Sequence, residues 1–296
     1  MTEEKRMAGK PVADKLTEEN RRLAHALQER GVTPTLAILR IGERPEDMAY
    51  ETGAVKRAEK TGVQVRHIVL DPSVSQELLL EEINRLNRDE TIDGVLMLRP
   101  LPATIDEKYV CEQLAPSKDV DGITSGSMAG VFMDTDQGFP PCTAQACMEM
   151  LDYYGVELKG KRVLIMGRSL VIGKPVTMMA MKRHGTVTVI HSRTRREDLA
   201  KAGQDAEIVI AAMGRAKMVG PEILGRDQVI LDVGINTDEN GALCGDVDYE
   251  AVLPQAAMIT PVPGGVGSVT TAVLMKHVLQ AASARADFCC ARAVFR

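Results

Sequence analysis

The stretch VLIMGRSLVIGKP, residues 163–175, constrains the fold more than any other part of the chain. Four apolar residues lead into Gly167, which is the pattern of a short strand buried on both faces. Gly173 follows six residues after Gly167, and a helix-compatible run then extends from Pro175 to His184. A strand, a glycine-bounded turn and a helix make the first unit of a dinucleotide-binding fold, where N–H groups at the helix start bind a pyrophosphate. Because the spacing is not G-x-G-x-x-G, a β–turn–α packing element remains the alternative.

Similar strand and helix patterns recur along the chain. Strands are predicted at residues 35–41, 63–70, 93–98, 163–166, 186–190, 207–211 and 229–233, and helices at 10–30, 46–61, 76–86, 175–184 and 270–284. Their alternation predicts an α/β fold with parallel sheets and right-handed crossovers. Residues 116–141, rich in Gly, Ser, Asp and Pro, interrupt the rhythm and predict a loop-rich passage between two domains. Thr143 is then the expected N-cap of a helix that extends to Tyr154.

Composition excludes several classes of protein. A net charge of −5 without a basic cluster, and the absence of Trp, argue against nucleic acid as a partner. No apolar run reaches 18 residues and the N-terminus has no apolar core, so neither a membrane span nor a secretory signal is expected. The six cysteines are predicted to be reduced thiols of a cytoplasmic protein. The scattered histidines predict no metal site, and no G-x-S-x-G elbow is present.

The loop after the strand at residues 186–190 bears on the choice of cofactor. His191, Ser192 and Arg193 follow that strand, and no carboxylate occurs before Glu197. A carboxylate here would bind a ribose 2′-OH, whereas guanidinium groups suit a 2′-phosphate. Together with Arg168 in the first turn, the loop favours NADP, with NAD as the alternative. A solvated basic loop without a ligand would have the same composition.

Two further strings are candidate binding loops. PSKDVDG, residues 116–122, holds two aspartates in a glycine-bounded turn, where such residues usually cap local N–H groups. TPVPGGVG, residues 260–267, combines stiff prolines with glycines that permit close approach of a flat ligand. A tight connection to the last helix is the alternative for the second string.

Taken together, the strings identify a known family. TIDGVLMLRPLP, PSKDVDG, PPCTA, GRSLVIGKP, VTVIHSRT, DVGIN and TPVPGGVGSVT resemble, in order and spacing, the methylenetetrahydrofolate dehydrogenase/cyclohydrolase family over residues 35–279. The resemblance implies a folate-binding catalytic domain of residues 1–140 with 270–296 and a Rossmann-type NAD(P)-binding domain of residues 141–269. It also implies a C-terminal helix that packs back on the first domain, a folate in the cleft between the domains, and a homodimer joined through the cofactor domains.

The resemblance also assigns site residues. Tyr50 matches the tyrosine that stacks on the folate, and Asp121 matches the aspartate that binds the pterin; these two are the predicted catalytic residues. The predicted substrate-binding residues are Tyr50, Leu98, Asp121, Pro263, Gly264 and Gly265, and the predicted cofactor-binding residues are Gly167, Arg168, Ser169, Gly173, His191, Ser192, Arg193 and Ile235.

Two departures from the family pattern predict a lost activity. Ala54 stands where the family has the lysine of Y-x-x-x-K, which serves the cyclohydrolase step and helps to orient the folate, and Leu98 stands where it has that lysine's glutamine partner. Hydrolysis of a methenyl group needs a group that moves protons, whereas hydride transfer depends mainly on positioning.

The sequence therefore predicts an NADP-dependent methylenetetrahydrofolate dehydrogenase with little cyclohydrolase activity. One alternative is the usual bifunctional enzyme, with Lys56 in the role of the missing lysine. The other alternative is a folate- or nucleotide-binding paralogue without turnover.

Overall fold

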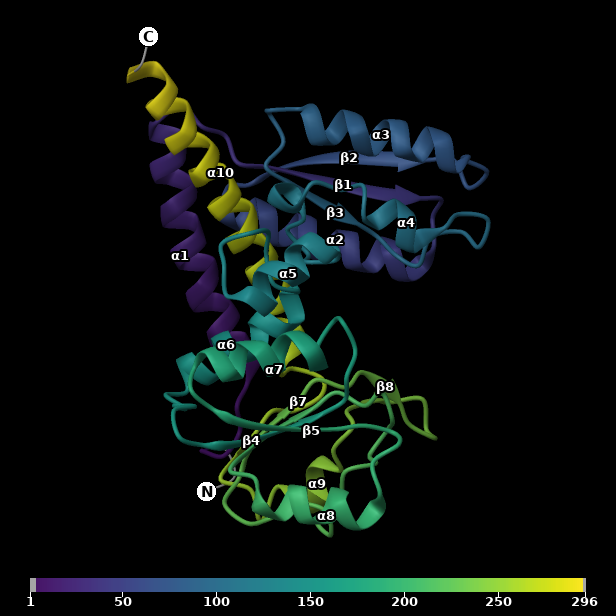
Figure 1. The fold of residues 1–296 in the computed structure, drawn as a ribbon, viewed down its shortest axis with the longest axis vertical. Helices are drawn as coiled ribbons and strands as arrows, with labels where there is room; N and C mark the ends of the chain where they lie inside the picture. Colours follow the sequence, from purple (N-terminus) through teal and green to yellow (C-terminus); the bar gives the residue numbers. More distant parts are fainter. Residues whose placement is uncertain (1–3, 295–296) are drawn as a thin grey trace. The chain divides into compact units, whose positions relative to one another are not determined.

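The computed structural model describes the backbone of residues 4–294 and the side chains of residues 4–287. Two compact units make up the chain (Figure 1): Asp14–Cys142 with the chain from Thr271 onward, and Thr143–Thr270 with the chain up to Ala13. We call them the three-stranded unit and the five-stranded unit after their sheets. No described helix combines the length and the apolar character that a bilayer span requires.

The N-terminal segment packs with the five-stranded unit, whereas the sequence placed it in the first domain. Met7 N donates to Ile259 O at 2.9 Å, and Gly9 N donates to Gly264 O at 2.7 Å. These bonds to the end of the five-stranded unit account for the difference.

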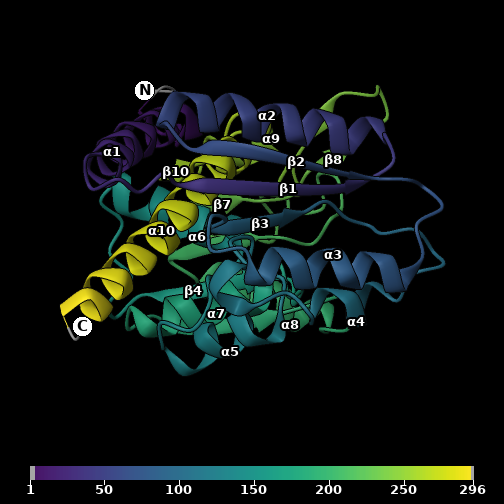
Figure 2. The same cartoon turned by 90° about the horizontal axis from the view of Figure 1, so that it is seen from above.

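The three-stranded unit is built on a parallel sheet of order β2-β1-β3. Its strands are β1 (Thr35–Ile41), β2 (Gln64–Leu70) and β3 (Gly94–Met97). Helices α2 (Pro45–Thr61) and α3 (Gln76–Arg88) cover opposite faces of this sheet (Figure 2). Ala37 and Leu39 of β1 join a core cluster with Leu79 and Ile83 of α3. The alternation of side chains along β1 therefore turns Arg40 toward α2.

Two long helices, α1 (Gly9–Glu29) and α10 (Thr270–Val294), run side by side (Figure 1). Asn20 of α1 donates its amide to Ala272 O at 2.8 Å, and Arg285 of α10 pairs with the buried Asp93 at 2.7 Å. The C-terminal helix thus packs on the three-stranded unit, as predicted, and is ten residues longer than the predicted helix at residues 270–284.

The passage at residues 116–141 contains more regular structure than its composition predicted. Besides η1 (Pro116–Lys118) it holds helix α5 (Ser125–Met133), whose N-cap Thr124 accepts a hydrogen bond from Ser127 N at 3.1 Å. The prediction that Thr143 caps the next helix is wrong, since α6 (Cys142–Tyr153) begins one residue earlier. The short α4 (Glu107–Cys111) precedes this passage.

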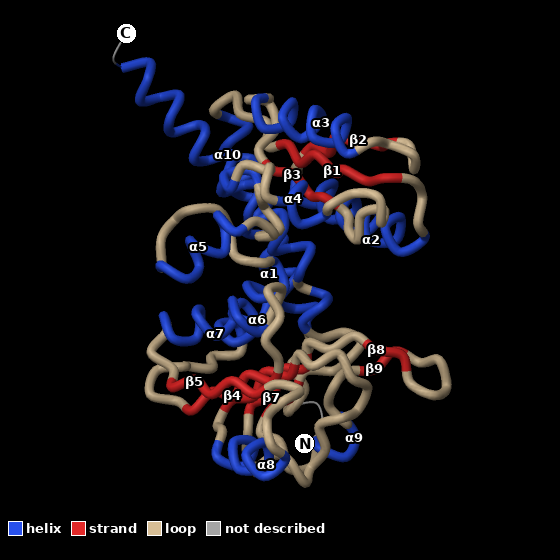
Figure 3. Tube along the Cα trace, turned by 45° about the vertical axis from the view of Figure 1, so that its right-hand side comes forward, coloured by secondary structure: helices blue, strands red, loops and turns tan. Residues whose placement is uncertain are grey.

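The five-stranded unit has an entirely parallel sheet of order β10-β7-β6-β4-β5. The strands are β4 (Arg162–Met166), β5 (Thr186–Ile190), β6 (Ile208–Ala211), β7 (Val229–Asp232) and β10 (Met258–Ile259). Helices α6 and α7 (Gly173–Lys182) lie on one face, and α8 (Arg196–Asp205) and α9 (Tyr249–Val252) on the other (Figure 3). A small antiparallel pair, β8 (Asn236–Thr237) and β9 (Leu243–Cys244), and the turn η2 (Val266–Ser268) complete the unit.

Strand order marks one edge of this sheet for ligand binding. The chain passes from β4 outward to β5 and then crosses back to β6 on the other side of β4. Ligands of open parallel sheets bind beyond the carboxyl ends of the strands, where the order reverses in this way. The turn after β4 therefore occupies the position that the Rossmann-type prediction requires.

Candidate functional site

The turn after β4 closes so tightly that only glycine fits at both of its ends. Gly167 has φ +131°, and a Cβ added to it would lie 2.2 Å from Ala212 O. A Cβ on Gly173 would lie 2.3 Å from the carbonyl oxygen of Gly167. Between these glycines, the exposed Arg168 and Ser169 have backbone N–H groups that donate to no acceptor among the described residues. Backbone donors in a turn that leads into a helix, here α7, fit a pyrophosphate.

The turn after β5 lies beside it, because Met166 and Ile190 are paired at the ends of adjacent parallel strands. His191 N donates to Thr194 Oγ1 at 3.0 Å, and Arg193 N donates to the His191 Nδ1 at 3.2 Å. In this turn the His191 Nδ1 acts as a hydrogen-bond acceptor. The structure thus brings the two predicted cofactor-binding loops together.

Three arginines near these turns differ in whether a carboxylate already pairs with their guanidinium group. Arg195 is paired with Asp198 at 2.9 Å. The exposed Arg168 and Arg193 form no ion pair with any described residue. Ile235, the remaining predicted cofactor residue, follows β7 at the same edge of the sheet and is 70% exposed. The edge thus combines free cations and an apolar surface.

Two buried aspartates that sequence reasoning missed hold the neighbouring loops in place. Asp246 accepts hydrogen bonds from Arg215 N at 2.7 Å and from Asn236 Nδ2 at 2.9 Å. Asp232 accepts from Asp246 N at 3.0 Å and from Val247 N at 2.9 Å. Burial raises the pKa of Asp232 to about 6, although these backbone donors lower it in part. The DVGIN string contains Asp232, but its partners are too distant in sequence to be predicted.

The predicted loop at Pro263–Gly265 lies after β10 in the same unit. Its Gly264 has φ +102°, a left-handed conformation that favours glycine. The N-terminal segment packs closely against this loop. Gly9 N donates to Gly264 O, and a Cβ added to Gly9 would lie only 2.1 Å from Gly265 O. Pro263 and Gly264 are exposed.

The predicted substrate residues Tyr50 and Leu98 belong to the three-stranded unit. Tyr50 lies in α2 and is 37% exposed, while Ala54, one turn further, is fully buried. Lys56 is exposed on another side of the helix. Leu98 follows β3, is 6% exposed and donates its N–H to Leu39 O at 2.9 Å. Positions 54 and 98 are therefore apolar and buried, and neither contributes a group that can titrate.

The two aspartates of PSKDVDG have different roles. Asp119 is fully buried and accepts from Ile123 N at 2.9 Å, Thr124 N at 2.8 Å and Ser127 Oγ at 2.7 Å. Asp121 is only partly exposed, yet it accepts no backbone hydrogen bond from the described residues. The capping interpretation thus holds for Asp119, whereas Asp121 caps no backbone N–H group of the described residues.

Burial raises the pKa of Asp121 to about 6, although the positive charge of Arg99 and a hydrogen bond from the Cys142 thiol lower it in part. Such a raised pKa means that the ionised carboxylate lacks the stabilisation that water or local donors would give it. A ligand that presents N–H donors would supply that stabilisation.

Polar side chains from three elements of the same unit also meet, and the sequence did not predict this cluster. Arg40 of β1 lies with its Nε 2.8 Å from the Glu51 Oε2 of α2, and the His67 Nδ1 of β2 lies 2.5 Å from Glu51 Oε1. The one available signal was Arg40 itself, a charge inside the apolar run TLAILRI. We call these three residues the Glu51 cluster.

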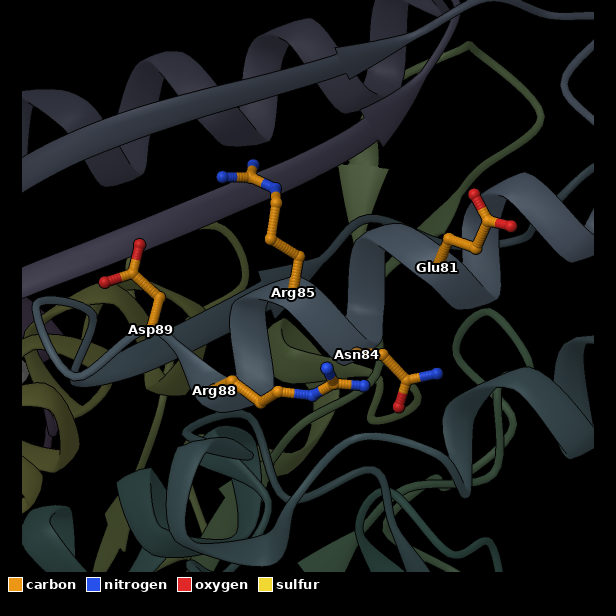
Figure 4. A pocket seen from close by; sticks show the side chains of 5 residues that line it. All are labelled: Glu81, Asn84, Arg85, Arg88 and Asp89. Carbon is orange, nitrogen blue, oxygen red and sulfur yellow. The ribbon is translucent and has the colours of Figure 1, made fainter.

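A surface pocket on α3 holds none of the predicted site residues. It is lined by Glu81, Asn84, Arg85, Arg88 and Asp89 (Figure 4). Two of its charges are already neutralised, since Arg85 bonds to Glu82 at 2.9 Å and Asp89 pairs with Arg66 at 2.7 Å. Within the described residues, no group of three or more His, Cys, Asp or Glu could hold a metal ion.

Family models match both units. Residues 7–121 match the catalytic domain of tetrahydrofolate dehydrogenase/cyclohydrolase, and residues 141–286 match its NAD(P)-binding domain. The chain is 45% identical over 273 residues to a bifunctional protein FolD of Clostridioides difficile, covering 92% of this chain and 94% of that protein.

Solved structures agree with this match. The bifunctional enzyme FolD, a methylenetetrahydrofolate dehydrogenase/cyclohydrolase from Campylobacter jejuni, superposes with a TM-score of 0.91 at 33% identity, covering 94% of this chain and 98% of that one. The methylenetetrahydrofolate dehydrogenase-cyclohydrolase of Trypanosoma brucei, solved with NADP cofactor and inhibitor, gives a TM-score of 0.86 at 33% identity, with coverages of 93% and 96%.

Proposed function

Because the chain belongs to the tetrahydrofolate dehydrogenase/cyclohydrolase family, we propose that it oxidises 5,10-methylenetetrahydrofolate to the 5,10-methenyl form with NADP+. The observation that carries the proposal is the partly buried Asp121, whose carboxylate accepts no local backbone donor. A pterin ring presents N–H donors that match such a carboxylate. Tyr50, exposed on α2, offers an aromatic face against which a flat ring can stack.

The proposed reaction makes few demands on the protein's own acid–base groups. When bound, the dinucleotide supplies the hydride acceptor, the C4 atom of its nicotinamide ring. Loss of a hydride from the methylene carbon leaves the methenyl cation, so no proton needs to be removed. Asp121 and Tyr50 hold the folate, and the turns after β4 and β5 hold the phosphates. This division of roles is compatible with an alanine at position 54.

The basic experiment follows absorbance at the nicotinamide band with methylenetetrahydrofolate and either dinucleotide. Reduction of the dinucleotide by the wild-type protein supports the proposed enzyme. A protein that binds both ligands but shows no reduction would be the non-catalytic paralogue.

The preference for NADP+ over NAD+ is the second part of the proposal. It is supported by Arg168 and Arg193, whose guanidinium groups pair with no described carboxylate and flank the predicted phosphate turn. A charge-assisted hydrogen bond is worth about 1.5–3 kcal/mol, so Arg168→Ala should raise the KM for NADP+ by about 10- to 100-fold and leave that for NAD+ unchanged. Arg195→Ala is the matched control, because Arg195 is already paired with Asp198. A wild type that prefers NAD+, with no loss in Arg168→Ala, refutes the assignment.

A third part is that the chain has little cyclohydrolase activity. Hydrolysis of the methenyl cation adds water and releases a proton, and a general acid–base group contributes about 10²–10⁴-fold to such a step. The fully buried Ala54 and the buried Leu98 cannot supply one, and Lys56 lies exposed two residues, or about 200° of helix, away from Ala54. The names of the FolD relatives favour the alternative, a bifunctional enzyme.

The decay of methenyltetrahydrofolate absorbance, compared with its rate in buffer alone, distinguishes a dehydrogenase with little cyclohydrolase activity from a bifunctional enzyme. Little acceleration beside robust dehydrogenase activity supports the proposal. Comparable hydrolase and dehydrogenase rates that Lys56→Ala abolishes would establish the bifunctional alternative.

We also infer a homodimer joined through the five-stranded unit. Strand β5 is an edge of its sheet, and the adjacent apolar side chains Val189 and Met181 are 40% and 54% exposed. Val189→Lys should convert a dimer into a monomer in sedimentation, and a monomeric wild type contradicts the inference. A cytoplasmic location is proposed as well, supported by four buried cysteines that are free thiols; Cys289 and Cys290 lie outside the described side chains.

A further inference from the structure

The Glu51 cluster ties α2 to the sheet at the turn that carries Tyr50. Glu51 is the residue after Tyr50, and Ala54 lies one helical turn beyond it. The carboxylate of Glu51 contacts Arg40 on β1 and His67 on β2, so one side chain binds its helix to two strands. Arg44, the N-cap of α2, pairs with Asp47 at 2.7 Å, but this ion pair lies at the start of the helix and reaches no strand.

Burial makes these contacts obligatory for the folded state. The side chains of Arg40 and Glu51 are 10% and 8% exposed, whereas that of His67 is 50% exposed. A buried carboxylate without a counter-charge is strongly disfavoured, so Glu51 must remain where Arg40 can reach it.

The contact between Arg40 and Glu51 is one of charge rather than of an aligned hydrogen bond. Although Arg40 Nε and Glu51 Oε2 are 2.8 Å apart, neither atom has a hydrogen-bond partner of good geometry. Another guanidinium nitrogen of Arg40 donates to Gly42 O, just beyond the end of β1. Arginine stays charged at every working pH, so this anchor is permanent. The backbone after β1 and the Tyr50 turn of α2 are thus fixed by the same side chain.

We propose that Glu51 is a positioning residue for folate binding: held by Arg40 and His67, it fixes the turn of α2 that presents Tyr50. This inference rests on the proposed function. Stacking on a ring tolerates little displacement, and a shift of about 1 Å can cost on the order of 100-fold in rate. The cluster therefore sets the affinity for the folate although none of its members needs to touch the ligand.

The first test compares two substitutions on the same helix. Glu51→Gln keeps the size of the side chain and removes its charge, and we expect the KM for methylenetetrahydrofolate to rise about 10- to 100-fold. The KM for NADP+ should stay unchanged, because its predicted site lies in the other unit. Glu59→Gln, on the exposed side of α2, is the control and should alter neither value.

A second test separates positioning from a purely structural role. Replacing both members of a buried ion pair by apolar residues often restores stability. Arg40→Leu/Glu51→Leu should therefore melt near the wild-type temperature, yet retain the raised KM for folate. If the KM returns to the wild-type value together with the melting temperature, the cluster is structural only and the proposal is wrong.

A readout that does not depend on turnover uses the absence of tryptophan from this chain. Tyr50→Trp places the single tryptophan of the variant at the turn in question. In that background, Glu51→Gln should lower the fluorescence anisotropy of the indole and increase its quenching by acrylamide, whereas Glu59→Gln should not. Equal anisotropy and quenching in all three proteins would overturn the proposal. Failure of the proposed function can be distinguished from failure of this inference, because the wild type itself would then not reduce a dinucleotide.

Discussion

The substitution Asp121→Asn should stabilise the protein while it weakens folate binding. Burial raises the pKa of this carboxyl from 3.8 to about 6, and one pKa unit corresponds to about 1.4 kcal/mol. At pH 8, where Asp121 is ionised in both states, its charge therefore costs the folded state roughly 3 kcal/mol. Asparagine has nearly the same shape and no charge to bury.

The pH dependence of the protein's stability follows from the raised pKa of Asp121 in the folded state. Since the folded protein binds the proton more tightly than the unfolded chain, stability falls as pH rises from about 4 through about 6. The advantage of Asp121→Asn should thus be about 3 kcal/mol at pH 8 and about half of that at pH 5. Denaturant unfolding at the two pH values measures it. In the wild type, kcat/KM for folate should fall below about pH 6 as Asp121 gains its proton.

The neighbouring Asp119 is the control for this prediction. Its carboxylate accepts three hydrogen bonds, so Asp119→Asn should destabilise the protein at both pH values. Asp121→Asn should also raise the KM for folate about 10- to 100-fold without altering that for NADP+. The reasoning is refuted if Asp121→Asn destabilises at pH 8 as Asp119→Asn does, or if its KM for folate is unchanged.

Two further substitutions test the packing around the proposed sites. Gly173→Ala would place a Cβ 2.3 Å from Gly167 O, so it should destabilise the protein by about 1–3 kcal/mol and raise the KM for the dinucleotide; unchanged thermal unfolding and kinetics would contradict this. Arg285→Met leaves the carboxylate of Asp93, whose side chain is 1% exposed, without its cation, and chemical denaturation should show a loss of about 3–5 kcal/mol. Arg21→Met breaks an exposed pair and should cost under about 1 kcal/mol, and equal losses in the two variants would refute the argument.

Residue patterns predicted β1 because it is buried along its whole length, and they predicted the mostly exposed β5 from its β-branched residues, TVTVI. Strands β1 and β5 have the predicted bounds, whereas β10, with two residues, is too short to leave a pattern. Helix α5 was missed because its glycines were interpreted as loop signals. A Cβ on Gly130 would lie 2.0 Å from Gln137 O, so close packing selects glycine within this helix. Composition alone cannot distinguish a glycine chosen for packing from one chosen for a turn.

The sequence predicted only those features of the candidate site that depend on residues close to one another in the chain. The glycines of the proposed phosphate turn follow from the backbone that a tight strand–helix turn requires, and a Cβ on Gly167 or Gly173 would lie within 2.3 Å of a carbonyl oxygen. The division of roles between Asp119 and Asp121 depends on which backbone N–H groups face which carboxylate, and that is decided by the folded loop. The pairing of Arg40 with Glu51 likewise depends on helix α2 lying across β1.

The exchange of terminal segments between the units has a consequence for how the chain is made. The three-stranded unit takes its last helix from the end of the chain, whereas the five-stranded unit takes its first segment from the beginning. A ribosome releases residues in order, so the unit that is encoded later becomes complete once residue 270 has emerged. The three-stranded unit becomes complete only after α10 has been synthesised and has packed on Asp93 and Asn20. Nascent chains arrested after residue 270 should therefore protect β4 to β7 from protease while β1 to β3 remain cleavable.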